Sequence, residues 1–152
     1  MERSRLVDLV KGADLVLLGT ALDSESSWQG GRILTRVRVQ VEEVWAGIAP
    51  ATGIVEVVTL GGVVGDLGQM VSGEASIARH DRVVLFLARQ NGVFRVLGMA
   101  QGVFRVLAQA GEPEQVERAL SGIAWVESSP AELFPDRLDA LRGRVTELRD
   151  AR

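Results

Sequence analysis

The 152-residue chain contains no cysteine, no tyrosine and a single histidine. Without cysteine there can be no disulfide, no thiolate nucleophile, no iron–sulfur cluster and no cysteine-type zinc site. One histidine is too few for a histidine-rich metal site. Carboxylates, serines and threonines are left as the candidates for chemistry, and we expect neither a metal nor a cofactor.

Long hydrophobic runs and an excess of positive charge are also missing. No stretch approaches about 18 consecutive apolar residues, and the chain as given does not begin with a signal peptide, so no membrane insertion is expected. Residues 1–109 carry eleven cationic and eleven anionic side chains, whereas residues 110–152 carry six and nine and account for the net charge of −3. No basic field is therefore expected to attract nucleic acid or anionic lipid at long range.

The rest of the composition is that of a folded globular protein. Hydrophobic residues make up 47% of the chain and charged residues 24%, and 152 residues is an ordinary length for one domain. The residue usage changes near residue 110. We expect a β-barrel domain with an N-terminal helix over residues 1–109, and a helical C-terminal extension over residues 110–152 that packs on it to form one structural unit.

Alternating hydrophobicity predicts a long strand over residues 32–45, with the hydrophobic side chains on one face. Glu42 and Glu43 interrupt the alternation, so a bulge or bend is expected there. Residues 61–73 are predicted to form a long glycine-rich loop. Further strands are predicted over residues 14–28, 53–60, 82–89, 93–97 and 102–107, with tight hairpin turns at Gly30 with Gly31 and at Asn91 with Gly92.

Helices are expected near both ends of the chain. Residues 4–12 place their apolar side chains on one stripe, and residues 114–120 have the pattern of one or two helical turns. The strongest helical pattern covers residues 130–149. Its apolar seam consists of Phe134, Leu138, Leu141, Val145 and Leu148.

Together these elements predict a mainly β fold with helices at both ends. Short strands joined by hairpins are typical of a small antiparallel barrel, because curling the sheet removes its exposed edges. The bent second strand and the long connection after the third favour a five- or six-stranded barrel of the OB-like type. An open sheet with the terminal helix across one face is the alternative architecture.

The residues able to perform chemistry are poorly placed for it. His80 and Asp81 are neighbours that point to opposite sides of an extended chain, so Asp81 cannot orient the imidazole toward a serine such as Ser72. The glycine-rich run lacks the Gly-Lys-Ser/Thr ending of a phosphate-binding loop. Glu42 and Glu43 have the spacing of neither an acid–base pair nor a calcium loop. We therefore expect no catalytic residue and no enzyme.

Two sets of residues are candidates for binding. The first lies in the predicted turn and loops and comprises Trp28, Gly30, Gly31, Gly61, Gly62, Gly65, Asp66 and Ser72. The second is a set of arginines on predicted strands, which with a nearby tryptophan could stack bases or sugar rings: Arg32, Arg36, Arg38, Arg95 and Arg105. Acidic residues balance these arginines over the domain, which favours the first set.

A series of segments carries a resemblance to known proteins. In order along the chain they are residues 13–20, 24–28, 31–35, 41–47, 61–73, 83–87 and 98–102. They resemble a largely uncharacterised group of bacterial proteins, usually exported, that is similar in outline to the netrin-like domain of tissue inhibitors of metalloproteinases. The resemblance implies a netrin-like barrel and a periplasmic or secreted location. Those inhibitors reach a catalytic zinc through an N-terminal cysteine, and no residue of this chain can take that role.

The leading hypothesis is a non-catalytic module that binds another protein through its loops. The resemblance implies an extracytoplasmic protease as a partner and an activity like that of a protease inhibitor. Single-stranded nucleic-acid or glycan binding on the arginine and tryptophan face is the alternative. A hydrolase that uses Ser72 or His80, and self-association through Leu141 on the C-terminal helix, are further hypotheses.

Overall fold

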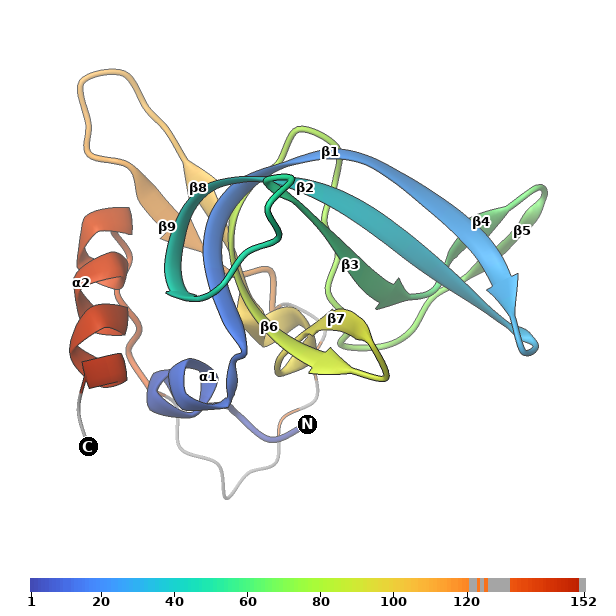
Figure 1. The fold of residues 1–152 in the computed structure, drawn as a ribbon, viewed down its shortest axis with the longest axis horizontal. Helices are drawn as coiled ribbons and strands as arrows, with labels where there is room; N and C mark the ends of the chain where they lie inside the picture. The colour runs from blue at the N-terminus through green and yellow to red at the C-terminus, as the bar shows by residue number, and fades with distance from the viewer. Residues whose placement is uncertain (121–122, 124, 126–131, 151–152) are drawn as a thin grey trace.

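The computed structural model describes residues 1–120, 123, 125 and 132–150, and is mainly β (Figure 1). Two helices, nine strands and one short 3-10 helix follow one another along the described chain. They are α1 (Leu6–Gly12), β1 (Leu15–Gln29), β2 (Arg32–Gly47), β3 (Ile54–Leu60), β4 (Gly62–Val64), β5 (Leu67–Gln69), β6 (Arg82–Gln90), β7 (Val93–Val96), η1 (Met99–Gly102), β8 (Val103–Leu107), β9 (Gln115–Glu117) and α2 (Leu138–Asp150).

Strands β1 and β6 pair with each other, and residues 15–19 of β1 and 83–87 of β6 are buried on both faces. Their register runs from Leu15 opposite Leu87 to Thr20 opposite Arg82. Successive side chains of a strand point to opposite faces, so Leu15 and Leu17 enter one hydrophobic cluster while Val16 and Leu18 enter another. This double burial explains why both strands begin with continuous apolar runs rather than with an alternating pattern.

The main sheet closes partly into a ring. Antiparallel pairing links β1 to β2, β2 to β3, β7 to β6 and β6 back to β1, and a parallel contact between Val57 and Phe94 joins β3 to β7. Strand β8 pairs with β6 over residues 83–85, whereas β7 pairs with it over residues 87–90. The hexapeptide Gly-Val-Phe-Arg-Val-Leu occurs twice, at residues 92–97 and 102–107, and its two copies contain the strands β7 and β8, which follow one another along β6. Strand β9 extends the sheet beyond β8.

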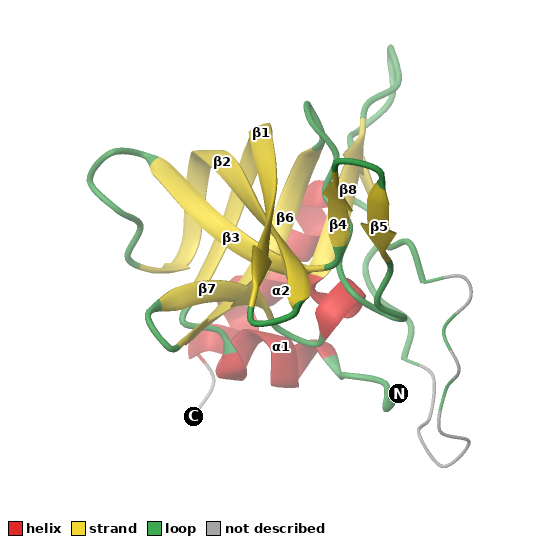
Figure 2. Ribbon diagram, turned by 90° about the vertical axis from the view of Figure 1, so that its right-hand side faces the viewer, coloured by secondary structure: helices red, strands yellow, loops and turns green. Residues whose placement is uncertain are grey.

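Both helices lie on one side of the sheet, against the outer face of β1 and β6 (Figure 2). Leu9 of α1 and Leu141 of α2 are buried in the same cluster as Phe86. The ring interior holds the second cluster, which includes Leu85 and Val57. The sheet thus separates two cores, one inside the ring and one beneath the helices.

The outer halves of β1 and β2 form a long hairpin that extends away from the helices (Figure 1), and we call residues 20–40 the arm. Gly30 and Gly31 both have positive φ, as a type I′ turn requires. The register of β1 and β2 shifts at three places, two of them opposite residues 41–46 of β2. The predicted irregularity at Glu42 and Glu43 is therefore present, and it bends β2 around the ring.

Three expectations about local structure are wrong, and two of them concern strands. Residues 61–73 are not an unbroken loop, because β4 and β5 form a hairpin whose turn is Gly65 and Asp66. Residues 114–120 contain strand β9 instead of helical turns, because Val116 is buried and its backbone pairs with β8.

The third concerns the C-terminal helix, which begins at Leu138 and not near residue 130. Pro135 disfavours a helical conformation in the residue before it, and Arg137 forms a bridge with Gln115 of β9. Phe134 nevertheless packs against the helix-side core, so it continues the apolar seam without being helical. The start of the expected helix at residues 130–131 lies outside the described residues.

Substitution of Phe86 by alanine tests whether the β1–β6 layer supports the whole fold. The side chain is fully buried and contacts the Phe104 ring at a centroid distance of 5.7 Å. We expect Phe86→Ala to lower the free energy of unfolding by about 3–5 kcal/mol, measured by urea denaturation. Ile48→Ala, at a side chain that is 90% exposed, should change it by less than about 0.5 kcal/mol. Equal effects of the two would contradict this account.

Candidate functional site

The arm and the β4–β5 hairpin come together at one end of the molecule (Figure 1). The Thr35 hydroxyl donates to the Gly61 carbonyl at 2.7 Å, and the Ile33 N–H donates to Gln69 Oε1 at 2.7 Å. A Cβ at Gly62 would lie 2.5 Å from the Ser26 hydroxyl oxygen, so the close approach of β4 requires glycine there. Direct hydrogen bonds and close packing therefore fix the second hairpin on the arm.

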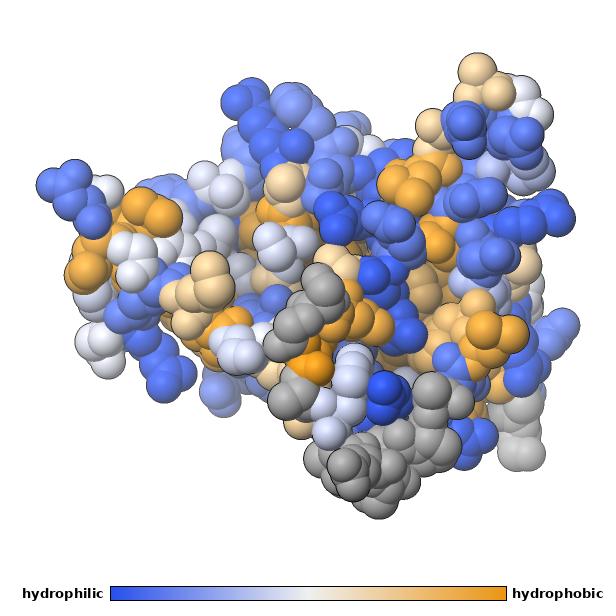
Figure 3. Space-filling view, turned by 180° about the vertical axis from the view of Figure 1, so that it is seen from behind, coloured by the Kyte–Doolittle hydropathy of each residue, from blue (hydrophilic) through white to orange (hydrophobic). Residues whose placement is uncertain are grey.

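Hydrophobic side chains are exposed on these two hairpins. The exposed fraction is 46% for Trp28, 66% for Val63, 51% for Leu67 and 97% for Met70, and we call these four residues the apolar rim. In the view from behind, hydrophobic atoms lie on the surface at the left-hand end, where the hairpins are (Figure 3). Val63 pairs with Gly68 and Leu67 pairs with Val64, so the β4–β5 hairpin exposes hydrophobic side chains on both of its faces. Single exposed apolar residues are common, but several large ones on adjacent hairpins are typical of an interaction surface.

Two neighbouring pockets lie beside the apolar rim. The larger, of about 520 Å³, lies between β2, β3 and residues 69–77, and Gly61, Gly62 and Ser72 of the candidate set line it. The smaller, of about 320 Å³, is lined by Gly31 of the candidate set and by Arg32. Residues that border both pockets are Leu60, Gln69 and Val71.

The other candidate loop residues lie at the hairpin turns. Trp28 and Gly30 are at the end of the arm, and Gly65 and Asp66 form the β4–β5 turn. The structure thus places the first candidate set within the two hairpins and the pockets beside them.

Glu74 holds the far wall of the larger pocket in place, and no pattern in the sequence singles it out. Its side chain is 5% exposed, and its carboxylate accepts hydrogen bonds from Arg95 Nη2 at 2.7 Å, the Leu60 N–H at 2.8 Å and the Ala75 N–H at 2.9 Å. Leu60 lies at the end of β3, beyond the single contact of β3 with β7. Glu74 therefore attaches the segment after β5 to the place where the ring stays open.

The arginines of the second candidate set fall into two groups. On β2, Arg38 pairs with Asp23 at 2.9 Å and Arg36 lies 3.8 Å from Glu56. Arg95 is bound to Glu74, and Arg105 borders a small cavity of about 30 Å³ beside the same carboxylate. Arg32 makes no ion pair among the described residues. Acidic neighbours thus neutralise three of the five arginines.

His80 and Asp81 form a turn before β6. His80 is exposed with a φ of 73°, and its backbone N–H donates to the Ala21 carbonyl at 2.9 Å. The Asp81 carboxylate accepts the Ala78 N–H at 3.0 Å. Asp81 thus stabilises the backbone of this turn.

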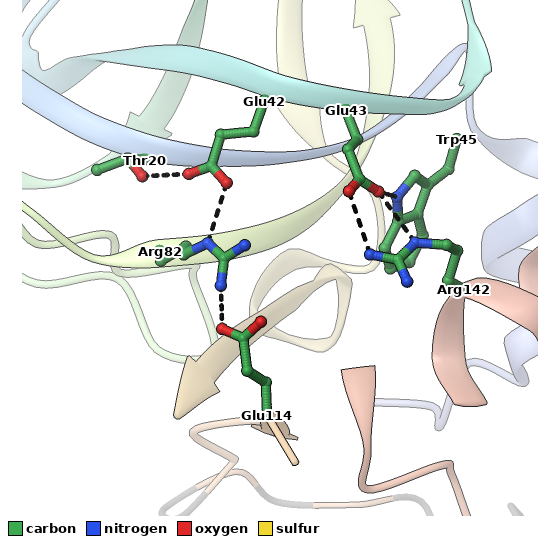
Figure 4. Close-up of polar contacts among 7 residues, drawn as sticks. All are labelled: Thr20, Glu42, Glu43, Trp45, Arg82, Glu114 and Arg142. Atoms are coloured by element: carbon green, nitrogen blue, oxygen red, sulfur yellow. Dashed lines mark hydrogen bonds and ion pairs between the residues drawn. The ribbon is translucent and has the colours of Figure 1, made fainter. Parts of the chain in front are cut away.

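Glu42 and Glu43 are exposed to solvent and also make ion pairs (Figure 4). The Arg82 guanidinium binds both Glu42 and Glu114, and the Thr20 hydroxyl donates to Glu42 at 2.6 Å. Burial disfavours the charged form of Arg82 and lowers its pKa. The hydrogen bonds and electrostatic attraction of Arg82 to Glu42 and Glu114 outweigh the effect of burial, so the pKa of Arg82 is raised. The cluster joins β2 and β6 to the chain before β9.

The Glu43 carboxylate connects β2 to the C-terminal helix. It accepts hydrogen bonds from Trp45 Nε1 at 2.9 Å and from Arg142 Nε at 2.9 Å. The hydrogen bond from Trp45 is the largest cause that lowers the pKa of Glu43. Desolvation opposes it, and the hydrogen bond and positive charge of Arg142 lower the pKa further. The carboxylate is thus held ionised, which suits a structural contact and not a proton donor.

Comparison with known proteins finds no matching family model, no similar curated protein and no matching solved structure. Within the described part of the chain, no three His, Asp or Glu side chains are grouped closely enough to hold a metal ion. Neither described helix has the length and hydrophobicity to cross a membrane. Function must therefore be argued from the two hairpins and the pockets beside them.

Replacement of Glu43 by glutamine should weaken the fold in a pH-dependent way. Because the folded protein lowers the pKa of Glu43 from its ordinary value of 4.5, its contribution is present above that value and is lost as the pH falls through the lower folded value. The side chains of Arg142 and Glu43 are 40% and 43% exposed, so the effect at pH 7 should be about 0.5–1 kcal/mol.

Urea denaturation of Glu43→Gln and the wild type across the acid range measures this difference. Glu147→Gln, which affects an exposed pair within α2, is the control and should stay near the wild type throughout. A difference between Glu43→Gln and the wild type that persists undiminished in acid would contradict the ionic origin.

Replacement of Glu74 by alanine should release the segment that it holds. The Leu60 N–H and Arg95 would lose their acceptor, and breaking such a buried pair costs about 3–5 kcal/mol. In hydrogen exchange, we expect faster exchange of the Leu60 amide and of residues 70–77, with the β1–β6 amides still protected. Glu56→Ala, at an exposed pair with Arg36, is the control, and equal exchange in the two variants would refute this role.

Proposed function

We propose that the protein is a non-catalytic binding module that recognises another protein through the arm tip and the β4–β5 hairpin. The observation that carries the proposal is the apolar rim, whose four large hydrophobic side chains are at least 46% exposed on two hairpins fixed to each other. Burying such side chains against a partner is favourable by about 25 cal/mol per Å² of apolar surface. The pockets beside the rim offer sites for the partner's side chains.

An OB-like barrel of netrin-like type is the architecture that we propose for this module. The pairing order β1–β2–β3–β7–β6 with return to β1, and the parallel contact of β3 with β7, support a five-stranded, partly open barrel. Together with the segment resemblance, this favours a periplasmic or secreted setting and an extracytoplasmic protease as the partner. With no cysteine in the chain, inhibition would have to rest on surface contacts and not on zinc chelation.

Protein binding accounts for the surface better than nucleic-acid or glycan binding does. A single-strand binder combines a positive groove with stacking aromatic residues. Here Arg36, Arg38 and Arg95 have acidic neighbours, and the other three members of the apolar rim are not aromatic. The apolar rim is therefore suited to an apolar protein surface.

Site-specific crosslinking followed by direct binding tests the proposal. A photoreactive residue at position 67 of the full chain would capture neighbours in the native host, and each captured protein would be purified and titrated against the chain by calorimetry. We expect Met70→Asp to weaken binding of the true partner about tenfold or more, because it places a charge within the apolar rim. The control is Ile48→Asp, which changes an exposed hydrophobic residue in the β2–β3 turn and should leave affinity within about twofold.

A parallel titration with single-stranded oligothymidylate tests the alternative. Salt-sensitive binding that Arg36→Glu with Arg38→Glu abolishes, and that Met70→Asp does not affect, would overturn the proposal. So would equal losses of protein binding for Met70→Asp and Ile48→Asp. Loss specific to Met70→Asp, with no oligothymidylate binding, supports it.

A further inference from the structure

The backbone of β5 has one edge paired and one edge open. Strand β5 pairs with β4 through Val64 with Leu67, Val63 with Gly68, and Gly62 with Gln69, and no other strand of the described chain pairs with it. In an antiparallel hairpin closed by a two-residue turn, hydrogen-bonded and non-hydrogen-bonded pairs alternate from the turn. Leu67 and Gln69 thus direct their backbone groups to β4, whereas Gly68 directs its N–H and carbonyl to the open edge.

This open edge is flanked by side chains that would favour the binding of an additional strand from another molecule. Leu67 and Met70 are members of the apolar rim, and Gln69 and Val71 border the smaller pocket. Arg32 also borders that pocket and has no ion-pair partner among the described residues. An added strand would thus meet apolar surface along β5 and an uncompensated cation near its end.

We propose that β5 binds an extended segment of the partner protein as a third strand beside Gly68, with apolar side chains in alternation and an acidic residue facing Arg32. This inference rests on the proposed function and specifies how that surface recognises its partner. Main-chain hydrogen bonds to Gly68 supply affinity, and side chains on the rim and in the pocket supply specificity. The acidic residue follows from charge complementarity with Arg32.

The open edge of β5 differs from the outer edge of β9, the last strand of the main sheet. The segment before α2 covers the edge of β9, because Arg137 forms a bridge with Gln115. The Val116 N–H also donates to the Asp136 carbonyl at 2.8 Å. No described segment pairs with the open edge of β5, and the strand has glycine at its centre, which allows another backbone to approach closely without a side chain between them. These two features together favour β5 as the strand that is extended.

Gly68 allows the backbone contact to be tested apart from the side chains. A Cβ at Gly68 would lie 3.7 Å from Val63 Cγ2 and 3.9 Å from the Gly62 carbonyl oxygen, which is ordinary contact, so alanine fits. Proline also lacks the N–H, and it is tolerated on an edge strand where that N–H faces away from its neighbour. Gly68→Pro therefore removes the outward donor, and Gly68→Ala is its matched control.

The probe is a phage-displayed library of short random peptides selected on the full wild-type chain. We expect the selected peptides to alternate apolar residues with an acidic one. The best of them, synthesised, should bind Gly68→Ala like the wild type and Gly68→Pro at least tenfold more weakly. Arg32→Glu should change the selected acidic residue to a basic one. Circular dichroism and the exchange of the Leu67 and Gln69 amides would establish that both Gly68 variants keep the β4–β5 hairpin.

Four other results of these binding experiments would contradict the inference. Equal binding of the peptide by Gly68→Pro and Gly68→Ala, with loss in Met70→Asp, would overturn strand addition and leave the apolar rim as a protein-binding surface. No effect of Gly68→Pro or of Met70→Asp would contradict the proposed function as well. A wild-type dimer that Gly68→Pro dissociates would identify a second copy as the occupant and overturn the inference of a partner segment. Selection of peptides without the apolar and acidic pattern would overturn it too.

Discussion

The pairing of β1 with β6 is the contact on which the rest of the structure depends. The paired segments, residues 15–19 of β1 and 83–87 of β6, are buried on both faces, so one pair of backbones separates and supports both hydrophobic clusters. The helices cover one face, and the ring of β2, β3 and β7 encloses the other. Every other element of the main sheet is therefore positioned, directly or through a neighbour, by a layer whose paired residues lie outside the candidate binding surface.

The two ends of the molecule are stabilised by different kinds of interaction. At the helix end, the packing of Leu141 and Phe86 is reinforced by the ion pairs of Glu43 and Arg82. At the arm end, where the ring is open, hydrogen bonds to Thr35, Gln69 and Glu74 hold the chain after β3 in place. Hydrophobic packing and ion pairs thus hold the helices at the first end, and a small number of directed polar contacts attach the β4–β5 hairpin and the segment after it at the second.

The features that were predictable from the sequence are those that depend on local pattern. The alternation along β2, the turns at Gly30 and Asn91, and the apolar runs of β1 and β6 are readable because they follow from backbone periodicity and turn chemistry. Contacts between residues far apart in the sequence cannot be predicted from local pattern. Glu74 acts through residues 14 and 21 positions away, and β9 forms because β8 offers it an edge. Trp28 can be predicted as a binding residue from its residue type. Met70 can be identified as one only in the structure, where the β4–β5 hairpin lies against the arm.

The arm has a consequence for how the protein can change over time. Its tip contributes little to either hydrophobic cluster, since none of the side chains from Ser24 to Arg32 is fully buried. Substitutions at the tip change the surface without removing buried side-chain atoms from the two hydrophobic clusters that determine folding. New specificities can therefore arise by sequence drift at the hairpin tips while the thermodynamic stability inherited from the β1–β6 layer stays constant, so the fold separates the residues that adapt from those that must be retained.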